Sequence, residues 1–546
     1  MKKATPRRSV AATMCTVCVA AVAAGACTPE KPDVTGPPPT SVPIRRLTNA
    51  EYVATVGDLF PGYTLPDIVF VPDPKVLGFV NLSSSQTGSL VRMEQYETTA
   101  LAISQAVTAD PTTLTGCDAG AQGEAACVGP FLADFGKRAY RRPLTATEQD
   151  NLMALLARDE GSLSYPTRLS MVVQAMLLSP KFLFRPEIGD RAKQAPQGVP
   201  LTSWEIATRL SYFLTGTMPD AELAGAADAG TLRTQDQVIK QARRLLTSDR
   251  AQSQLVKFHM MWLGTDTVSS LAKNMNAYPS FHPLLAFYMA KETDQFLRKT
   301  LFEEGGTFAS LMVSDHTYLN DTMAQFYGVP GPGSDDVWAP TPLNTSQRVG
   351  LLTQASLLAT MAKEDRTDPV RRGKFVLNQI LCRTVQPPPP SIVAMFQPLD
   401  LSKTAREQFT QHRTNEVCAS CHNTIDPLGL PFEHYDGIGQ WRDNDRGMDI
   451  DATGSIQSKD GTEHAFDGVP AMARMLADMP DARACYADEW MRFAQGKLSS
   501  EDDTGYTDYR DWLMTRFTRN TRIVDLVATI VGSDTFRYLA PADGAP

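Results

Sequence analysis

Residues 418–442 read CASCHNTIDPLGLPFEHYDGIGQWR, and the first five of them decide how the whole chain is interpreted. Two thiols, Cys418 and Cys421, stand beside the imidazole of His422, close enough in sequence for the three to bind one group. On a helical turn the two thiols would be neighbours at positions i and i+3. This is the spacing at which haem c is attached, with the thiols on its vinyl groups and the imidazole on its iron. The pattern predicts one covalently bound haem c.

Two other interpretations of the motif stay open from the residues alone. A disulfide between Cys418 and Cys421 would leave the adjacent His422 without a purpose. A zinc site could add His412 to these three residues, although neighbouring Cys421 and His422 fit tetrahedral coordination poorly. In either case the segment would be a structural staple without a redox role.

A bound haem would need further residues. Methionine and histidine are usual axial partners of haem iron, so three residues could supply the sixth ligand: Met448, His412 and His464. Arginine is the natural partner of the two propionates. The arginines we consider for this are Arg371, Arg372 and Arg442, and the alternative interpretation is that they form structural ion pairs or are solvated.

Three acidic residues follow the motif closely and could be taken for an acid–base group: Asp426, Glu433 and Asp436. However, Asp before Pro and Asp before Gly are ordinary turn residues. We therefore interpret them as turn residues.

The first 27 residues, MKKATPRRSVAATMCTVCVAAVAAGAC, are typical of an export signal, with a basic start, an apolar stretch and small residues near the end. Their last four residues resemble a lipoprotein box, so Cys27 is the predicted lipidation site; simple cleavage of the signal and an uncleaved anchor are the alternatives. Residues 28–44 are rich in Pro and would form a semi-rigid tether. We expect an exported protein of the periplasm or cell surface, held to the outer membrane by a lipid anchor.

Six of the nine cysteines lie beyond Cys27, an even number that suits an oxidising compartment. If the two cysteines of CASCH hold a cofactor, four remain to pair with one another. The first pair is separated by a loop of small residues, and the second follows by elimination. The expected disulfides are Cys117 with Cys127, and Cys382 with Cys485.

Helix signals recur along the chain. The segments LTNAE (47–51), LTATE (144–148) and LTSWE (201–205) are capping boxes, in which Thr and Glu satisfy the first backbone amides of a helix. Apolar residues at helical spacing fill the runs 168–184, 237–264, 283–304 and 348–362. Strand-like alternation is scarce. The predicted fold is mainly α, a multi-domain helical array with a C-terminal cytochrome-c-like haem-attachment segment.

Pro-rich and Gly-rich stretches divide the chain after the tether. They separate an N-terminal helical region, a central helical region, a region with the CxxCH motif and a C-terminal helical domain. The expected boundaries are 45–190, 200–330, 345–445 and 446–540.

Further motifs run in order along the chain: RRLTNAEYVATVGDLF (45–60), FGKRAYRRPLTATEQ (135–149), QAMLLSPKFLFRPEIG (174–189), ATRLSYFLTGTMPDAEL (207–223), DPVRRGKFVLNQILC (368–382), IDATG (450–454) and IVGSDTFRY (530–538). The CASCH motif lies between DPVRRGKFVLNQILC and IDATG. This order of motifs resembles exported bacterial cytochrome-like proteins known from planctomycetes and myxobacteria, built from successive domains of unknown function. The resemblance implies the architecture and a haem. It implies no substrate.

The formal net charge of −9 argues against nucleic acid as a partner. Three hypotheses remain. The chain could transfer electrons to a redox partner protein at the cell envelope, or be a haem-dependent oxidoreductase that acts on an envelope substrate. The third is a non-redox binding or assembly protein in which the CASCH segment is held by a disulfide or a zinc ion.

Overall fold

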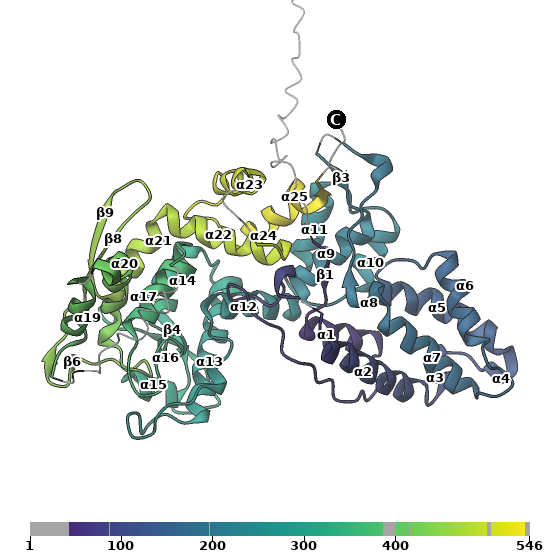
Figure 1. Ribbon diagram of the computed structural model, residues 1–546, viewed down its shortest axis with the longest axis horizontal. Helices are drawn as coiled ribbons and strands as arrows, with labels where there is room; N and C mark the ends of the chain where they lie inside the picture. The colour runs from purple at the N-terminus through teal and green to yellow at the C-terminus, as the bar shows by residue number, and fades with distance from the viewer. Residues whose placement is uncertain are drawn as a thin grey trace, which may run out of the picture. The chain divides into compact units, whose positions relative to one another are not determined.

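The computed structural model describes residues 43–86, 88–195, 197–385, 400, 402–414, 416–498 and 504–540, without the side chains of 411–417 and 504. The predicted leader, Cys27 and the tether up to residue 42 lie outside these residues. So does the polyproline run 387–390. Figure 1 gives the labels of the helices and strands.

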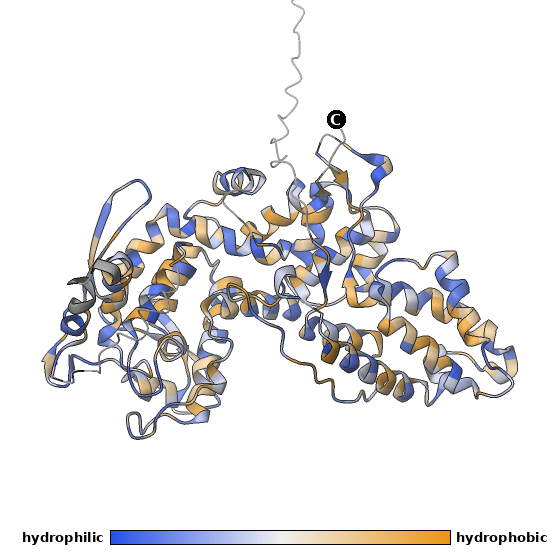
Figure 2. Cartoon of the chain, viewed as in Figure 1, coloured by the Kyte–Doolittle hydropathy of each residue, from blue (hydrophilic) through white to orange (hydrophobic). Residues whose placement is uncertain are grey.

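Most of the described chain is helical, as the sequence predicts, and its strands form short antiparallel pairs. All three predicted capping boxes are present, with reciprocal hydrogen bonds in the pairs Thr48–Glu51, Thr145–Glu148 and Thr202–Glu205. Figure 2 shows orange and blue residues on the same helices, as expected where one face of a helix is buried.

The N-terminal helices enclose a hydrophobic core of their own, drawn from residues 47–183 with Tyr212 and Met218. Aromatic side chains fill much of it, and the rings of Tyr52 and Tyr96 stack with centroids 5.7 Å apart. The elements are β1 (Arg45–Arg46), α1 (Asn49–Leu59), α2 (Leu90–Thr108), α3 (Pro111–Thr115), α4 (Ala119–Gln122), α5 (Glu124–Tyr140), α6 (Ala146–Leu156), α7 (Tyr165–Leu178), α8 (Pro180–Leu183) and β2 (Phe184–Arg185).

The central helices and the C-terminal half share a second, larger core. A third, smaller core lies between α13, α15 and α16. The central elements are β3 (Val199–Pro200), α9 (Ser203–Thr215), α10 (Ala221–Asp228), α11 (Gln235–Leu245), α12 (Asp249–Leu263), α13 (Pro283–Arg298), the π-helical turn η4 (Lys299–Glu303), α14 (Phe308–Val313), β4 (His316–Leu319), α15 (Asp321–Tyr327), β5 (Ala339–Pro342) and α16 (Ala355–Thr360).

The C-terminal half carries the motif segment and ends beside the central helices, where β10 pairs with β3. Its elements are α17 (Pro369–Phe375), the π-helical turn η6 (Val376–Ile380), α19 (Ala405–Thr414), α20 (Glu416–Gly429), η7 (Leu430–His434), β6 (Asn444–Asp445), β7 (Met448–Asp449), β8 (Thr453–Gln457), β9 (Glu463–Asp467), α21 (Gly468–Asp478), α22 (Pro480–Gln495), α23 (Thr504–Met514), α24 (Ile523–Gly532), α25 (Asp534–Arg537) and β10 (Tyr538–Leu539). The predicted domain boundaries stay a prediction.

A buried cluster of charges joins the first described segment to the C-terminal helices. Glu187 pairs with Arg45 at 3.0 Å and with Arg209 at 2.5 Å. The two arginines also donate to the carbonyl oxygens of Ala494 and Phe536. Burial lowers the pKa of Arg45 to about 10. Loss of Glu187 would leave two buried cations without their shared partner, so this cluster holds distant parts of the chain together.

Both predicted disulfides form, Cys117–Cys127 and Cys382–Cys485. Structural disulfides persist in oxidising compartments, so the two bonds fit a protein that works outside the cytoplasm. In the described part of the chain, no helix combines the length and apolarity needed to cross a membrane.

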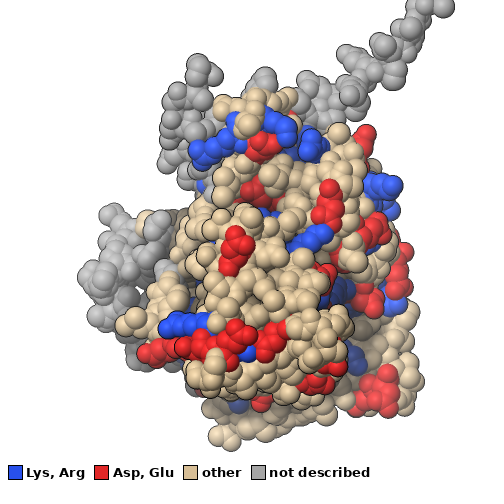
Figure 3. All heavy atoms as spheres, turned by 90° about the vertical axis from the view of Figure 1, so that its right-hand side faces the viewer, with Lys and Arg blue, Asp and Glu red and all other residues tan. Residues whose placement is uncertain are grey.

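Charged side chains of both signs lie on the face drawn in Figure 3, with clusters of Asp and Glu beside Lys and Arg. The chain as a whole is acidic, with a net charge of −9. The expectation that nucleic acid is not a partner stays a prediction.

Glu292 in α13 is a carboxyl group with no access to water. The hydroxyls of Thr317 and Tyr327 donate to it at 3.0 and 2.8 Å. Burial raises the pKa of Glu292 from 4.5 to about 7, although these two hydrogen bonds act in the opposite direction. Below neutral pH the core therefore holds this group as a neutral acid.

We predict that Glu292→Gln reduces the pH dependence of stability between pH 4.5 and 7. The folded protein keeps the Glu292 proton up to about pH 7, whereas the unfolded chain releases it near 4.5. The resulting stabilisation is complete below pH 4.5 and disappears as the pH rises through 7. Over this window the wild type should lose up to about 3 kcal/mol relative to the variant, measured by urea unfolding.

The exposed Glu303→Gln is the matched control and should keep the wild-type slope. Equal slopes for wild type and Glu292→Gln would contradict a buried neutral carboxyl group.

Candidate functional site

The CxxCH motif lies on α20, which packs against α19, α17 and the β8 strand. Cys418 and Cys421 are one helical turn apart, and both are partly exposed. They are the two described cysteines outside disulfides. The structure thus pairs the other four cysteines and leaves the motif thiols unbonded to each other, as expected if a cofactor takes them.

His422 is held by a buried carboxylate. Its Nδ1 lies 2.8 Å from Oδ1 of Asp426, one turn further along α20. Asp426 is completely buried, and its Oδ2 has no hydrogen-bond partner in the described structure. A carboxylate that accepts the Nδ1 proton fixes the ring tautomer, which places the lone pair on Nε2. The ring is therefore prepared to bind a metal ion through Nε2.

The interpretation of Asp426 as a turn residue is wrong. Pro427 follows it, but α20 continues through both residues to Gly429. Packing of the adjacent Ile425 and Leu428 in the large core outweighs the local preference of a residue before proline. Sequence reasoning missed this contact with His422, although the spacing of four residues was a usable signal.

The other two acidic residues behave differently. Asp436 does form a turn, since its carboxylate accepts from the amides of Ile438 and Gln440. Glu433 is buried in η7 and pairs with Arg442 at 2.9 Å. Burial raises the pKa of Glu433.

Two glycines set the position of α20. A Cβ atom at Gly373 in α17 would overlap the carbonyl oxygen of Ile425. A Cβ atom at Gly429 would overlap the carbonyl oxygen of Pro369. The two backbones therefore touch at a distance that only glycine permits, and the contact fixes the helix that carries the motif.

Arg372 and Arg442 lie at the C-terminal end of α20. Arg372 is 1% exposed and donates to the carbonyl oxygens of Phe432 and Tyr435, both at 3.0 Å. Arg442 forms ion pairs with Glu433 and Asp445. Their end of the helix is about 10 Å along the axis from His422. These contacts favour the structural interpretation that the sequence left open for both arginines.

Arg371 is exposed and lines a cavity of about 370 Å³ together with Val370, Lys374 and Asn378. At about 100° per residue, Arg371 lies about 160° around α17 from Gly373. Gly373 faces α20, so Arg371 points away from the motif helix.

The candidate sixth ligands are spread over different elements. Met448 lies in the β6–β7 hairpin, and His464 lies in β9, where its Nε2 is 3.3 Å from the Ser458 hydroxyl. His412 belongs to α19, but its side chain is outside the described residues. No described contact joins Met448 or His464 to His422.

The residues of α20 suit haem better than zinc. They offer two sulfurs and one oriented imidazole nitrogen, the donor set that haem c requires. Among the described side chains, three closely spaced metal-ligand atoms come together elsewhere, at Cys382, Cys485 and Glu489. The fourth zinc ligand considered from the sequence, His412, has its side chain outside the described residues.

Four family models match successive parts of the chain: PSD3, protein of unknown function (DUF1587), residues 45–109; PSD5, protein of unknown function (DUF1595), residues 127–187; PSD4, protein of unknown function (DUF1592), residues 201–329; and PSCyt3, protein of unknown function (DUF1588), residues 348–445.

The last match contains the CASCH segment, so the chain carries a cytochrome-like domain in its C-terminal half. The chain belongs to the planctomycete-type proteins that carry these domains of unknown function in series, which confirms what its motifs indicated. No curated protein and no solved structure matches it.

We predict that Gly429→Ala destabilises the protein by about 3 kcal/mol or more, because its methyl group must displace the backbone of α17. Thermal or urea unfolding measures the loss. Gly225→Ala in α10 is the matched control, since a Cβ atom there meets nothing within 4 Å.

The control should be neutral or stabilising by up to about 1 kcal/mol. Wild-type stability in Gly429→Ala would show that α17 and α20 do not touch as described.

Proposed function

We propose that this chain is an exported c-type haem protein that transfers electrons at the cell envelope. The observation that carries the proposal is the set of three donors on α20, with His422 oriented by the buried carboxylate of Asp426 at 2.8 Å. The match of residues 348–445 to a cytochrome-like family supports it.

Each residue has a defined role in this proposal. Cys418 and Cys421 would hold the porphyrin edge through thioether bonds, and His422 would bind the iron through Nε2. When bound, the haem supplies a one-electron redox centre. The Asp426 carboxylate would accept a hydrogen bond from Nδ1–H of His422. This bond would make Nε2 a stronger ligand for the iron and keep the ring in its orientation.

The identity of the sixth ligand is the second part of the proposal. Met448 would favour a high potential and simple electron transfer, and a histidine at 412 or 464 would favour a lower one. We do not include the three arginines as propionate partners. Arg372 already donates to a backbone carbonyl oxygen, and Arg442 donates to the carboxylate of Glu433. Arg371 points away from α20.

Export and lipid anchoring at Cys27 form the third part. They rest on the leader-like residues 1–27 and the Pro-rich segment 28–44. The two disulfides support a location outside the cytoplasm, where such bonds persist. The redox partner would then be another protein of the envelope.

Haem-linked oxidation of an envelope substrate is the second candidate function. The observation in its favour is the His422–Asp426 pair, because a histidine with a carboxylate partner donates more electron density to the iron. Carbon monoxide binding to the ferrous protein separates the two: rapid binding indicates an open iron position and favours oxidation over electron transfer.

We predict a visible Soret band that survives acid acetone when the protein is produced in a host that matures c-type cytochromes, because thioether bonds withstand denaturation. Replacing Cys418 and Cys421 by Ala should remove the band. The matched control replaces Cys117 and Cys127 by Ala and should keep it, since those sulfurs are already bonded to each other.

Colourless wild-type protein under these conditions would refute both redox functions. Zinc analysis and thiol titration of that protein would then distinguish a metal staple from a disulfide.

A further inference from the structure

The Cys382–Cys485 disulfide joins a partly exposed cysteine to a buried one. Cys382 lies two residues beyond the end of η6, in the left-handed conformation with φ 49°, and is partly exposed. Cys485 lies within α22 and is only 2% exposed. An external thiol would therefore reach the sulfur of Cys382 first.

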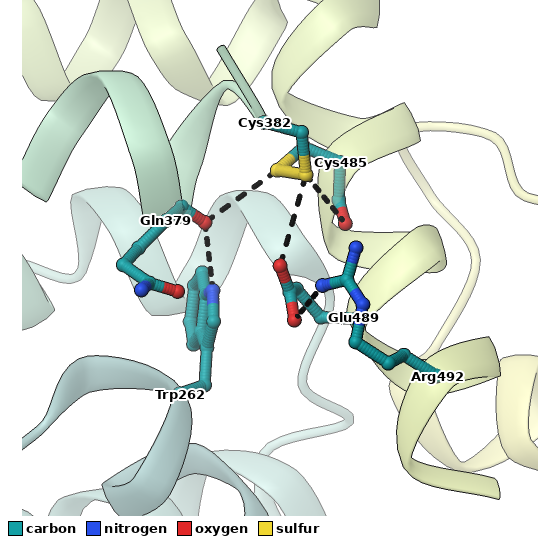
Figure 4. Close-up of a disulfide and its surroundings, with 6 residues drawn as sticks. All are labelled: Trp262, Gln379, Cys382, Cys485, Glu489 and Arg492. Carbon is teal, nitrogen blue, oxygen red and sulfur yellow. Dashed lines mark hydrogen bonds and ion pairs between the residues drawn. A yellow bond between two sulfur atoms is a disulfide. The ribbon is translucent and has the colours of Figure 1, made fainter. Parts of the chain in front are cut away.

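A carboxyl group lies against this disulfide (Figure 4). Glu489 follows Cys485 by one turn of α22, and its Oε1 is 3.7 Å from Sγ of Cys382. Its side chain is 2% exposed and pairs with Arg492 at 2.5 Å. Burial raises the pKa of Glu489, against the opposing effect of Arg492.

The burial of the Glu489 carboxyl group beside a disulfide needs an explanation. Burying a carboxyl group costs free energy, and a disulfide has no proton to share with it. A bond that only staples two helices needs no such neighbour. By contrast, a disulfide that opens and closes needs a group that gives and takes a proton at the buried sulfur, because a buried thiolate is unstable.

We propose that Cys382–Cys485 is a thiol–disulfide exchange site for an external dithiol, with Glu489 as its acid–base residue. A thiolate of the dithiol attacks Sγ of Cys382, the S–S bond breaks, and Cys485 leaves as a thiolate. The carboxyl group of Glu489, which has an oxygen within 4.8 Å of both sulfurs, gives its proton to Cys485. The second thiol of the dithiol then displaces Cys382, which leaves two protein thiols and one oxidised dithiol.

The neighbouring residues suit both states of this exchange. After proton transfer the Glu489 carboxylate is stabilised by Arg492. The Gln379 carbonyl oxygen lies 3.6 Å from Sγ of Cys485, and it is held by the indole N–H of Trp262 at 2.8 Å. In the reduced protein this carbonyl can accept a hydrogen bond from the Cys485 thiol.

The experiment follows both disulfides in the same folded sample. The purified protein is treated with dithiothreitol, its thiols are alkylated at intervals, and peptide mapping gives the reduction rate of each bond. The Cys117–Cys127 bond serves as the internal reference. Glu489→Gln should slow reduction of Cys382–Cys485 by about tenfold or more and leave the reference bond unchanged.

Asp488→Asn is the matched control, because Asp488 is also buried in α22 but has no described hydrogen bond to either sulfur. It should leave both rates unchanged. An unchanged rate in Glu489→Gln, or equal slowing by Asp488→Asn, would overturn the proposal.

A measurement on the wild type keeps the test valid even if Glu489→Gln fails to fold. Direct exchange gives a rate proportional to dithiothreitol concentration and insensitive to dilute urea. A rate that levels off and rises with urea would mean that the bond opens only on unfolding, and would identify a purely structural disulfide.

Discussion

The close backbone contact between α17 and α20 is the constraint on which the candidate site depends. Gly373 and Gly429 let the two helices touch, and Arg372 secures the chain beyond α20 by donating to the carbonyl oxygens of Phe432 and Tyr435. The motif residues occupy the preceding turns of the same helix. Because backbone contacts cannot adapt as side chains can, the orientation of α20 is fixed before any ligand binds.

The buried carboxylate of Asp426 gives the site its chemical character. An isolated CxxCH turn would leave its imidazole free to rotate and to exchange protons between its two nitrogens. In this chain the ring is oriented through Nδ1, and the unsatisfied Oδ2 of Asp426 marks a polar group kept in the core at a cost. This cost is understandable if His422 has a ligand to bind.

Local features of the fold could be predicted from the sequence, whereas relations across space could not. The helix starts at Thr48, Thr145 and Thr202 are each encoded in four consecutive residues. Both disulfides followed once the CASCH cysteines were assigned to a cofactor, the first from its small-residue loop and the second by elimination. Asp426 was misjudged because the proline rule is local and the packing that overrules it is not. The surroundings of Arg371 and Arg372 depend on which face of α17 meets α20, and the sequence does not determine that face.

The most direct measurement for this account is the intact mass of the protein matured in a host that attaches haem c. The account predicts the mass of the processed polypeptide with its two disulfides and any acyl chains, plus one haem. Peptide mapping should place that addition on the peptide with Cys418 and Cys421. A mass equal to the acylated polypeptide alone would contradict the central claim, however well the donors on α20 are arranged.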